Sequence, residues 1–548
     1  MSFELTPFSA ALSAADEYVS KAQAVTLELT SVDGKVDGGL IEKHQRIVHG
    51  YAWLKSSTTA LHSLLSWAER LQASAKLGKV EQLSLDIAFG ELLSQLVGGV
   101  AMGQNEFVRP SDFALFDESV HLAKNESVHY FLSSGNTADK RKALAEFCRD
   151  GIAVAEDFGD EFIDAARTQY RRFTDEKIVP HAHQWHLDNA LIPDDLVAEL
   201  AELGTFGVCI PEQYEGLGLG KLVMSVITEE LSRGWIAAGS LGTRSEIAGD
   251  LIHHGGTQEQ RSHWLPKIAS GEILPTAVFT EPDTGSDMGS LATRAIESDN
   301  GWRIKGAKTW ITHAARSDLM TLMARSKPDV NGYAGLSMFL APKPRGTEED
   351  AFPAVGMSGT EIEVLGYRGM REYELSFDDF ELDQSSLLGG EQGNGFKQLM
   401  QTFEGARIQT AARAVGVARR AYELGLSYAL ERKQFGKPIF DFPRVSDKIA
   451  MMSVDILIAR ELTYFAAREK DKGHRCDIEA GMAKLLAART AWSNADASLQ
   501  IHGGNGYALE YEISRILCDA RILNIFEGAG EIQAQVIARG LLSKRRPA

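Results

Sequence analysis

The chain has 548 residues, of which 44% are hydrophobic and 24% charged, and its formal net charge is −18. At about 150 residues per domain, this length predicts roughly three or four domains of an ordinary globular protein. The acidic balance argues against a nucleic-acid or anionic-membrane partner, because both need a basic surface.

Residues 1–160 are predicted to form an all-helical extension at the N-terminus. Apolar side chains recur there at helical spacing, most clearly from Ile47 to Leu71, where one helix face is apolar. A second helical domain is expected over residues 161–275. Pro180, Pro193 and Pro211 mark helix ends within it.

From Pro275 onward, short runs of β-branched and aromatic residues alternate with turns. The runs are 277–280, 301–304, 319–323, 336–340 and 374–377. The Asp299-Asn300-Gly301 sequence predicts a tight hairpin between two strands. Residues 276–390 are therefore expected to form a mainly antiparallel β domain.

The helical period returns after the Gly-Asn-Gly turn at 393–395 and persists to the C-terminus. Long amphipathic helices are expected over 411–430, 445–470 and 479–500. The predicted domain order is helical, helical, β and helical, with the last domain at 391–548.

The cysteines and the N-terminal sequence indicate the cellular compartment in which the protein is expected. Cys148, Cys209, Cys476 and Cys518 form no Cys-x-x-Cys pair, so neither a disulfide framework nor a metal site is expected. The N-terminus lacks a signal-like segment, and no apolar run reaches the length of a membrane span. We expect a cytoplasmic protein.

Two motifs in the β region suit a flavin. Residues 281–287 (Glu-Pro-Asp-Thr-Gly-Ser-Asp) follow a strand and offer backbone N–H groups and hydroxyls to a flavin pyrimidine edge or a pyrophosphate. Trp310 and Thr312 add an aromatic face and a hydroxyl on a strand. A solvated turn and a core tryptophan are the alternative readings of these residues.

Two motifs in the last helical region also suit a nucleotide. Residues 432–436 (Arg-Lys-Gln-Phe-Gly) combine a guanidinium with an aromatic ring, although a basic helix end gives the same pattern. Gly503, Gly504 and Gly506 allow close approach of a ligand to the backbone. No Gly-x-Gly-x-x-Gly stands between a strand and a helix, so a Rossmann nicotinamide site is unsupported.

Glu527 is the leading candidate for a catalytic base. Gly528 and Gly530 permit a sharp turn, and an apolar helical stripe begins at Ile532. The glutamate therefore lies on a loop that leads into a helix, where its carboxylate can face a cavity. A favourable partner of the helix dipole is the alternative.

Together and in this order, these motifs resemble the acyl-CoA dehydrogenase family over residues 160–543. The resemblance implies an α-helical domain, a middle antiparallel β domain and a C-terminal four-helix bundle, here preceded by the all-helical extension. It also implies FAD, an acyl-CoA thioester substrate that loses hydrogens from Cα and Cβ, and electron transfer to an electron-transfer flavoprotein.

The resemblance carries residue roles with it. Glu527 is the expected base, in an apolar setting. The expected FAD contacts are Thr280, Ser286, Trp310, Thr312, Gln500, Gly503 and Gly504, with Arg432 and Phe435 reaching the FAD of a neighbouring subunit. The expected substrate contacts are Ser286, Arg244, Arg407 and Gly528. No metal is expected.

Departures from the common family pattern narrow the range of expected substrates. They are the extension, His313-Ala314 where most members have Asn-Gly, and the polar strand at 371–374. These features favour members that act on a short acyl-CoA with a second carboxylate. A desolvated carboxylate needs a cation, and we nominate Arg244, for which an ion pair with Glu246 or with a surface acid is the alternative.

Other readings stay open at this point. They are another short or branched-chain acyl-CoA dehydrogenase, an acyl-CoA oxidase, and a DNA-binding flavoprotein of the alkylation response. The last carries its extra mass at a basic C-terminal end, whereas this chain is acidic and extended at its N-terminus. The extension is expected to restrict assembly to a homodimer rather than a tetramer.

Overall fold

The computed structural model describes residues 3–543. The chain divides into two compact units, the first made of Met1–Thr168 and Thr410–Ala548 and the second of Gln169–Gln409. The chain passes between the units within two helices, α8 (Glu161–Phe173) and α14 (Gly395–Glu431).

The first unit is helical apart from three hairpins of two-residue strands. Its helices are α1 (Thr6–Thr30), α2 (Gly38–Lys43), α3 (Gln45–Ala73), α4 (Lys79–Gly98), α5 (Phe116–Lys124), α6 (Glu126–Ser134), α7 (Ala138–Arg149), α15 (Pro443–Asp471), α16 (Asp477–His502), α17 (Ile513–Ile522) and α18 (Gly530–Leu542). The hairpins pair β1 (Ser31–Val32) with β2 (Lys35–Val36), β3 (Val100–Ala101) with β4 (Phe107–Val108), and β12 (Lys433–Gln434) with β13 (Lys437–Pro438). The helical character predicted for the extension is confirmed, with two of these hairpins added.

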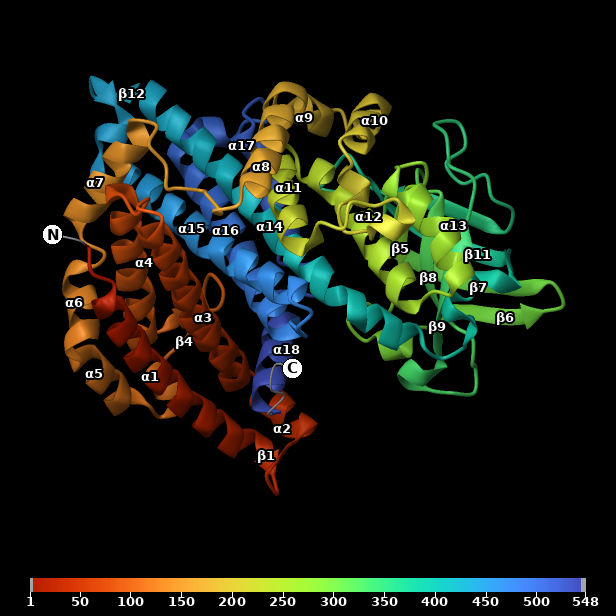
Figure 1. Cartoon of the computed structure of the whole chain (residues 1–548), viewed down its shortest axis with the longest axis horizontal. Helices are drawn as coiled ribbons and strands as arrows, with labels where there is room; N and C mark the ends of the chain where they lie inside the picture. The colour runs from red at the N-terminus through yellow and green to blue at the C-terminus, as the bar shows by residue number, and fades with distance from the viewer. Residues whose placement is uncertain (1–2, 544–548) are drawn as a thin grey trace. The chain divides into compact units, whose positions relative to one another are not determined.

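Helix α3 joins the extension to the C-terminal helices. It packs against α1 and α4 of the extension and against α15 and α18, as Figure 1 shows by the red and blue ribbons. Its Trp53, Leu64 and Trp67 are buried, and the guanidinium of Arg489 in α16 lies 4.4 Å from the ring centroid of Trp53. The extension therefore shares a core with the C-terminal helices. Such packing supplies most of the stability of an amphipathic helix.

Helices precede the sheet in the second unit. They are α9 (Val179–Leu187), α10 (Asp194–Glu202), α11 (Gly220–Gly234), α12 (Ile236–Gly255) and α13 (Gln258–Ala269). Pro180 lies in the first turn of α9 and Pro193 caps α10, as predicted. At the start of α13, Thr257 and Gln260 form a reciprocal capping box, which satisfies two free donors of the helix end.

The β region is a seven-stranded sheet. Its strands are β5 (Pro275–Val278), β6 (Arg294–Ser298), β7 (Gly301–Thr312), β8 (Leu319–Arg325), β9 (Leu336–Pro342), β10 (Met357–Ile362) and β11 (Glu372–Asp383). The order is β10-β11-β7-β6-β8-β5, with β9 also paired to β8. Only the pairs of β8 with β5 and with β6 are parallel among the described strands, so the mainly antiparallel prediction is confirmed.

The predicted hairpin and the continuous apolar strand both have clear causes. Ser298 of β6 pairs with Gly301 of β7, which leaves Asp299 and Asn300 as a two-residue turn. Along β8, Met320 and Leu322 join one hydrophobic cluster, and Leu319 and Met323 join another. This strand is apolar throughout because both of its faces are buried.

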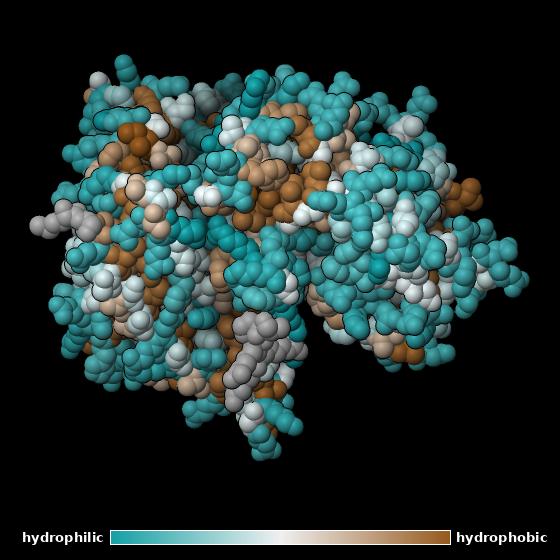
Figure 2. Space-filling view, in the orientation of Figure 1, coloured by the Kyte–Doolittle hydropathy of each residue, from teal (hydrophilic) through white to brown (hydrophobic). Residues whose placement is uncertain are grey.

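Hydrophilic residues cover most of the face drawn in Figure 2, and hydrophobic residues gather there in small patches. Among the helices within residues 3–543, none combines the length and the apolar character needed to cross a membrane.

Candidate active site

The predicted flavin turn follows β5 directly in the second unit. The backbone N–H of Glu281 donates to the Thr284 carbonyl at 2.9 Å, and that of Thr284 donates back to the Glu281 carbonyl at 3.1 Å. Ser286 is exposed beyond this tight turn. The carbonyl of Thr280, just before the turn, accepts from the Thr309 N–H of β7 at 2.9 Å, which ties the turn to the sheet.

A buried ion pair lies beneath the turn. The Glu281 carboxylate accepts hydrogen bonds from the N–H groups of Ala292 and Thr293 at 2.6 and 2.9 Å, and from Lys308 Nζ at 2.9 Å. Lys308 Nζ also donates to the Phe279 carbonyl at 2.9 Å. Burial would raise the pKa of Glu281, but Lys308 and these donors outweigh burial and lower it.

Sequence reasoning did not single out Lys308. The side chain is completely buried, and its strand partner is Leu375. A lysine at a buried strand position is rare unless it is paired. That rarity is the signal that could have identified it.

The side chains of Trp310 and Thr312, at the end of β7, differ in their exposure to solvent. Trp310 is 56% exposed with a left-handed φ of 57°, whereas Ile311 and Thr312 beside it are buried. Thr312 Oγ1 donates to Glu372 Oε1 at 2.8 Å, and the two residues also pair across β7 and β11. The core-tryptophan alternative is therefore wrong, since a broad aromatic face is left exposed.

Arg244 lies in α12 and is only 9% exposed. Its Nη2 donates to the Tyr367 hydroxyl at 3.3 Å. Burial raises the pKa of Glu372 to about 7, against the opposing effects of the Thr312 hydrogen bond and the Arg244 charge. Burial, aided by the charge of Arg244, lowers the pKa of His313 to about 3, so the imidazole is neutral at pH 7.

We call Arg244, His313, Tyr367 and Glu372 the Arg244 cluster. The cluster sets a guanidinium among a phenol, a neutral imidazole and a carboxyl with a raised pKa. Glu246, the alternative partner of Arg244, forms an ion pair with Lys221 at 2.7 Å. The cluster has the donors that a desolvated anion requires.

Arg407 also belongs to the second unit, in the part of α14 that precedes Gln409. It is 8% exposed, and its guanidinium lies 5.7 Å from the ring centroid of Phe403. The cation is thus held on a helix within a largely buried setting.

Glu527 lies in the first unit, on the loop between α17 and α18 as predicted. Its φ is 53°, and its side chain is 15% exposed. Arg413 Nη2 donates to Glu527 Oε2 at 2.6 Å, and the Thr410 hydroxyl donates to the same oxygen. The surroundings therefore differ from the apolar setting expected, because a fully buried arginine contacts the carboxylate.

Arg413 and Thr410 were missed by sequence reasoning. They lie in α14, 114 and 117 positions from Glu527, and no local pattern connects residues so distant in the chain. The guanidinium of Arg413 also lies 4.9 Å from the ring centroid of Phe526. This cation–π contact helps to hold Arg413 and the loop that carries Glu527 in place.

The turn after Glu527 requires glycine. Gly528 has a φ of 94°, and a Cβ there would come within 2.0 Å of Gln533 Nε2. Lys484 Nζ donates to the Gly528 carbonyl at 2.6 Å. Gln533 Nε2 donates to the Glu527 carbonyl at 3.3 Å, so side chains from α16 and α18 hold this backbone in place.

The remaining predicted FAD residues are exposed on the first unit. Arg432 and Phe435 lie at the β12–β13 hairpin, and Phe435 is 93% exposed with a φ of 53°. Gln500 lies in the last turn of α16, and Gly503 and Gly504 follow the helix with open space where a Cβ would stand. Thr280, Ser286, Trp310 and Thr312 belong to the second unit instead.

Comparison with known proteins decides the family. Residues 161–272, 276–380 and 393–542 match the N-terminal, middle and C-terminal domains of acyl-CoA dehydrogenases. The chain belongs to the acyl-CoA dehydrogenase family. It is an FAD-dependent oxidoreductase that dehydrogenates an acyl-CoA thioester.

Three known acyl-CoA dehydrogenases illustrate the likeness. The chain is 56% identical to the (2S)-methylsuccinyl-CoA dehydrogenase of Cereibacter sphaeroides, over 98% of both chains. It is 34% identical to the glutaryl-CoA dehydrogenase of Desulfococcus multivorans, over 69% of this chain and 96% of that one. A solved glutaryl-CoA dehydrogenase in complex with glutaryl-CoA aligns with a TM-score of 0.66 and 31% identity, covering 71% of this chain and 98% of that one.

The residues of this acyl-CoA dehydrogenase fit a flavin. Trp310 presents an aromatic face that the surrounding strand does not cover, and Ser286 presents a hydroxyl on an exposed turn. The turn is held from below by the Glu281–Lys308 pair. Exposed aromatic and hydroxyl groups on a rigid support are what the face and edge of an isoalloxazine ring require.

Proposed function

We propose that this acyl-CoA dehydrogenase converts (2S)-methylsuccinyl-CoA to mesaconyl-CoA in the cytoplasm and passes the electrons to an electron-transfer flavoprotein. The observation that carries the proposal is the 56% identity to a (2S)-methylsuccinyl-CoA dehydrogenase over 98% of both chains. That match spans the N-terminal extension, which the three family domains, at 161–272, 276–380 and 393–542, leave uncovered.

Glu527 takes the α-proton in this proposal. The reaction needs a base for this proton, and bound FAD supplies the hydride acceptor for Cβ. Arg413 and Thr410 both donate to Glu527 Oε2 and so hold the carboxylate in one orientation. The backbone N–H of Glu527 is assigned to the thioester oxygen, where one such donor contributes about 3–4 kcal/mol to the transition state.

Arg244 receives the second carboxylate of the substrate. Taking a carboxylate out of water is costly unless a cation and further donors replace the water. Arg244 is nearly buried, and the Tyr367 hydroxyl beside it and the neutral His313 can complete a polar pocket. The Arg244 cluster therefore supports a dicarboxylic substrate over a purely aliphatic one.

Anaerobic reduction of the bound flavin tests the proposal. We expect (2S)-methylsuccinyl-CoA to bleach the flavin absorbance fully, and glutaryl-, isobutyryl- and butyryl-CoA to do so much more slowly. Equal or faster bleaching by butyryl-CoA would rule out the dicarboxylic assignment. Peroxide formation at the rate of dye-linked turnover would instead identify an oxidase.

A further inference from the structure

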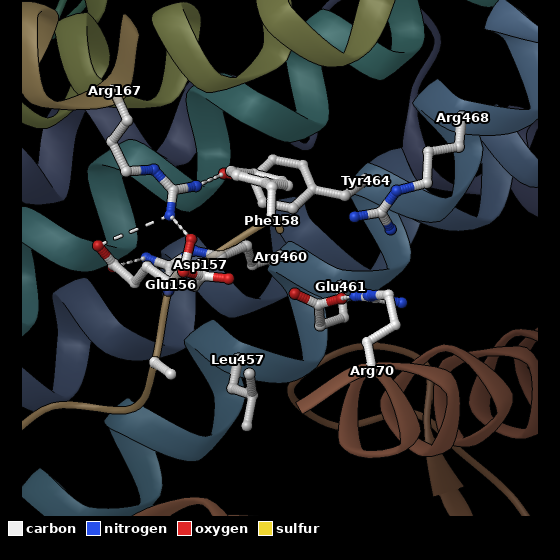
Figure 3. Close-up of a pocket in the computed structure, with 11 residues that line it drawn as sticks. Arg70, Glu156, Asp157, Phe158, Arg167, Leu457, Arg460, Glu461, Tyr464 and Arg468 are labelled. Atoms are coloured by element: carbon white, nitrogen blue, oxygen red, sulfur yellow. Dashed lines mark hydrogen bonds and ion pairs between the residues drawn. The ribbon is translucent and has the colours of Figure 1, made fainter. Parts of the chain in front are cut away.

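A small cavity in the first unit lies where the extension meets α15 (Figure 3). Its walls come from four parts of the chain. They are Arg70 of α3, residues 155–158 of the segment that connects α7 to α8 (the connecting segment), Arg167 of α8, and side chains of α15 between Leu457 and Arg468. The cavity volume is about 10 Å³, which is the space taken by about one water-sized species.

Arginines outnumber carboxylates around this cavity. The four arginines are Arg70, Arg167, Arg460 and Arg468, and the three carboxylates are Glu156, Asp157 and Glu461. This local excess of positive charge stands out in a chain with a net charge of −18. Arginine stays protonated at any physiological pH, so the excess cannot be relieved by loss of a proton.

Each carboxylate at the cavity has a close cationic partner. Glu461 Oε2 accepts from Arg70 Nη2 at 2.8 Å, and Glu156 Oε1 lies 3.0 Å from Arg460 Nη2. Asp157 pairs with Lys76, which lies just beyond α3. The pairs of Glu461 and Glu156 join the end of the extension to α15, and the pair of Asp157 with Lys76 holds residue 157 near the end of α3.

Arg167 completes the connection. Its guanidinium donates to the Glu156 carbonyl and to the Tyr464 hydroxyl, both at 2.6 Å. It also lies 4.6 Å from the ring centroid of Phe158. The two donor sites thus hold the connecting segment against α15.

Arg468 differs from the other three arginines. Among residues 3–543, its guanidinium has no hydrogen bond or ion pair, and its nearest ring contact is Phe158 at 5.9 Å from the centroid. Burial is the main cause that lowers its pKa; Glu461 opposes the shift and Arg70 adds to it. Glu461, which pairs with Arg70, thus also acts electrostatically on Arg468.

We propose that the cavity binds one small inorganic anion, with chloride as the physiological ligand, between the guanidinium groups of Arg468 and Arg70. A partly buried cation is stabilised by an anion more than by a neutral water. A volume of about 10 Å³ suits a single monatomic ion better than the larger phosphate or an organic carboxylate. The bound anion fastens residues 155–158 between α3 and α15 and so stabilises the first unit.

Thermal unfolding of the full-length, FAD-loaded enzyme tests this site. Chloride replaces gluconate at constant ionic strength, and we expect a saturable rise in Tm of about 2 °C when chloride exceeds its Kd about tenfold. Arg468→Gln should abolish the rise. Arg444→Gln, the same change at an exposed position of α15, should retain it.

Two results would overturn the proposal. One is a wild-type Tm that does not respond to chloride; the other is an Arg468→Gln variant that responds as the wild type does. If the Arg468→Gln variant does not fold, a second measurement on the wild-type enzyme tests the site. Crystals of the wild-type enzyme grown in bromide should show an anomalous peak between Arg70 and Arg468, and absence of the peak would refute the site. A peak without any effect of chloride on Tm would indicate an adventitious ion only and would also refute it.

Discussion

The residue that carries the chemistry in our proposal, Glu527, is positioned by contacts from outside its own loop. Arg413 donates to its carboxylate, and Gln533 and Lys484 donate to the carbonyls of Glu527 and Gly528. The positive φ values of 53° at Glu527 and 94° at Gly528 show a sharp backbone turn that such contacts must maintain.

Glu527→Gln should bind FAD normally and lose substrate-driven flavin reduction by about 10²–10⁴-fold, because an amide cannot accept the α-proton. Anaerobic stopped-flow absorbance measures the loss. Glu531→Gln, an exposed acid in the first turn of α18, serves as the matched control and should reduce at the wild-type rate. Unchanged reduction in Glu527→Gln would remove this residue from its role.

Arg244→Met should lower kcat/KM for (2S)-methylsuccinyl-CoA by about 30–1000-fold, the cost of leaving a buried charge without its partner. Butyryl-CoA, which lacks the second carboxylate, should lose little and serves as the internal control. Steady-state kinetics with both substrates decides the matter. Equal losses with the two substrates would mean that Arg244 supports the fold rather than the carboxylate.

Glu372 should make stability depend on pH. Burial raises its pKa in the folded enzyme to about 7, above its ordinary value of 4.5. The folded state thus keeps a proton that the unfolded state loses, so the contribution is full below pH 4.5 and is lost as pH rises to about 7. As the pH rises from 5 to 8, Glu372→Gln should therefore gain unfolding free energy relative to wild type, by at most about 3 kcal/mol, which thermal melts measure as a rising difference in Tm. Plots of Tm against pH that run parallel for the wild type and Glu372→Gln would contradict the raised pKa. Glu374→Gln, a change at an exposed position of the same strand, is the control.

At the scale of elements, the sheet supplies a rigid base for the flavin turn. The Glu281–Lys308 pair joins the turn to β7, and the Thr309–Thr280 hydrogen bond fixes the residue just before it. A cofactor-binding turn held by buried ionic and backbone contacts keeps its geometry without the cofactor, which lowers the entropic cost of binding.

Lys308→Met should weaken FAD binding at least about tenfold, because Glu281 would become a buried charge without its cation. Fluorescence titration of the apoenzyme with FAD gives the Kd. Lys305→Met, on the same strand but 43% exposed and paired with Asp379, should leave the Kd unchanged. Equal affinities in both variants would show that the pair does not support the turn.

Short-range patterns predicted most of the elements. The Asp-Asn-Gly sequence at 299–301 produced the expected hairpin, and the long amphipathic runs appear as α14, α15 and α16. Such elements are predictable because turn chemistry and periodicity are local properties. The predicted run at 301–304 and the predicted strand with Trp310 and Thr312 form one continuous strand, β7, since pairing with β11 extends along it to Thr312.

At the scale of the whole molecule, the extension accounts for the largest difference from shorter relatives. Its α3 packs on α15 and α18, which belong to the C-terminal helices of the same unit. The faces of α15 and α18 that contact α3 are therefore covered within this chain. The anion cavity lies at this same attachment.

We predict a homodimer in solution, on the expectation that the extension restricts further assembly by covering part of α15 and α18. Light scattering of the FAD-loaded enzyme should give twice the chain mass of 59.9 kDa. A mass of four chains would contradict this. The domain boundaries at 160, 275 and 390 also remain predictions, to be checked by limited proteolysis.

The amino-acid sequence alone predicted the element types and the place of Glu527 on a loop before a helix, and its ordered motifs resemble those of the family that the comparisons then showed. These depend on composition, periodicity and ordered motifs, all of which are local in the chain. Only the tertiary structure revealed Arg413 beside Glu527, Lys308 beneath the flavin turn and Arg468 at the anion cavity. Arg413 and Glu527 are 114 residues apart in the chain and Lys308 and Glu281 are 27 apart, and folding brings each pair within hydrogen-bond distance.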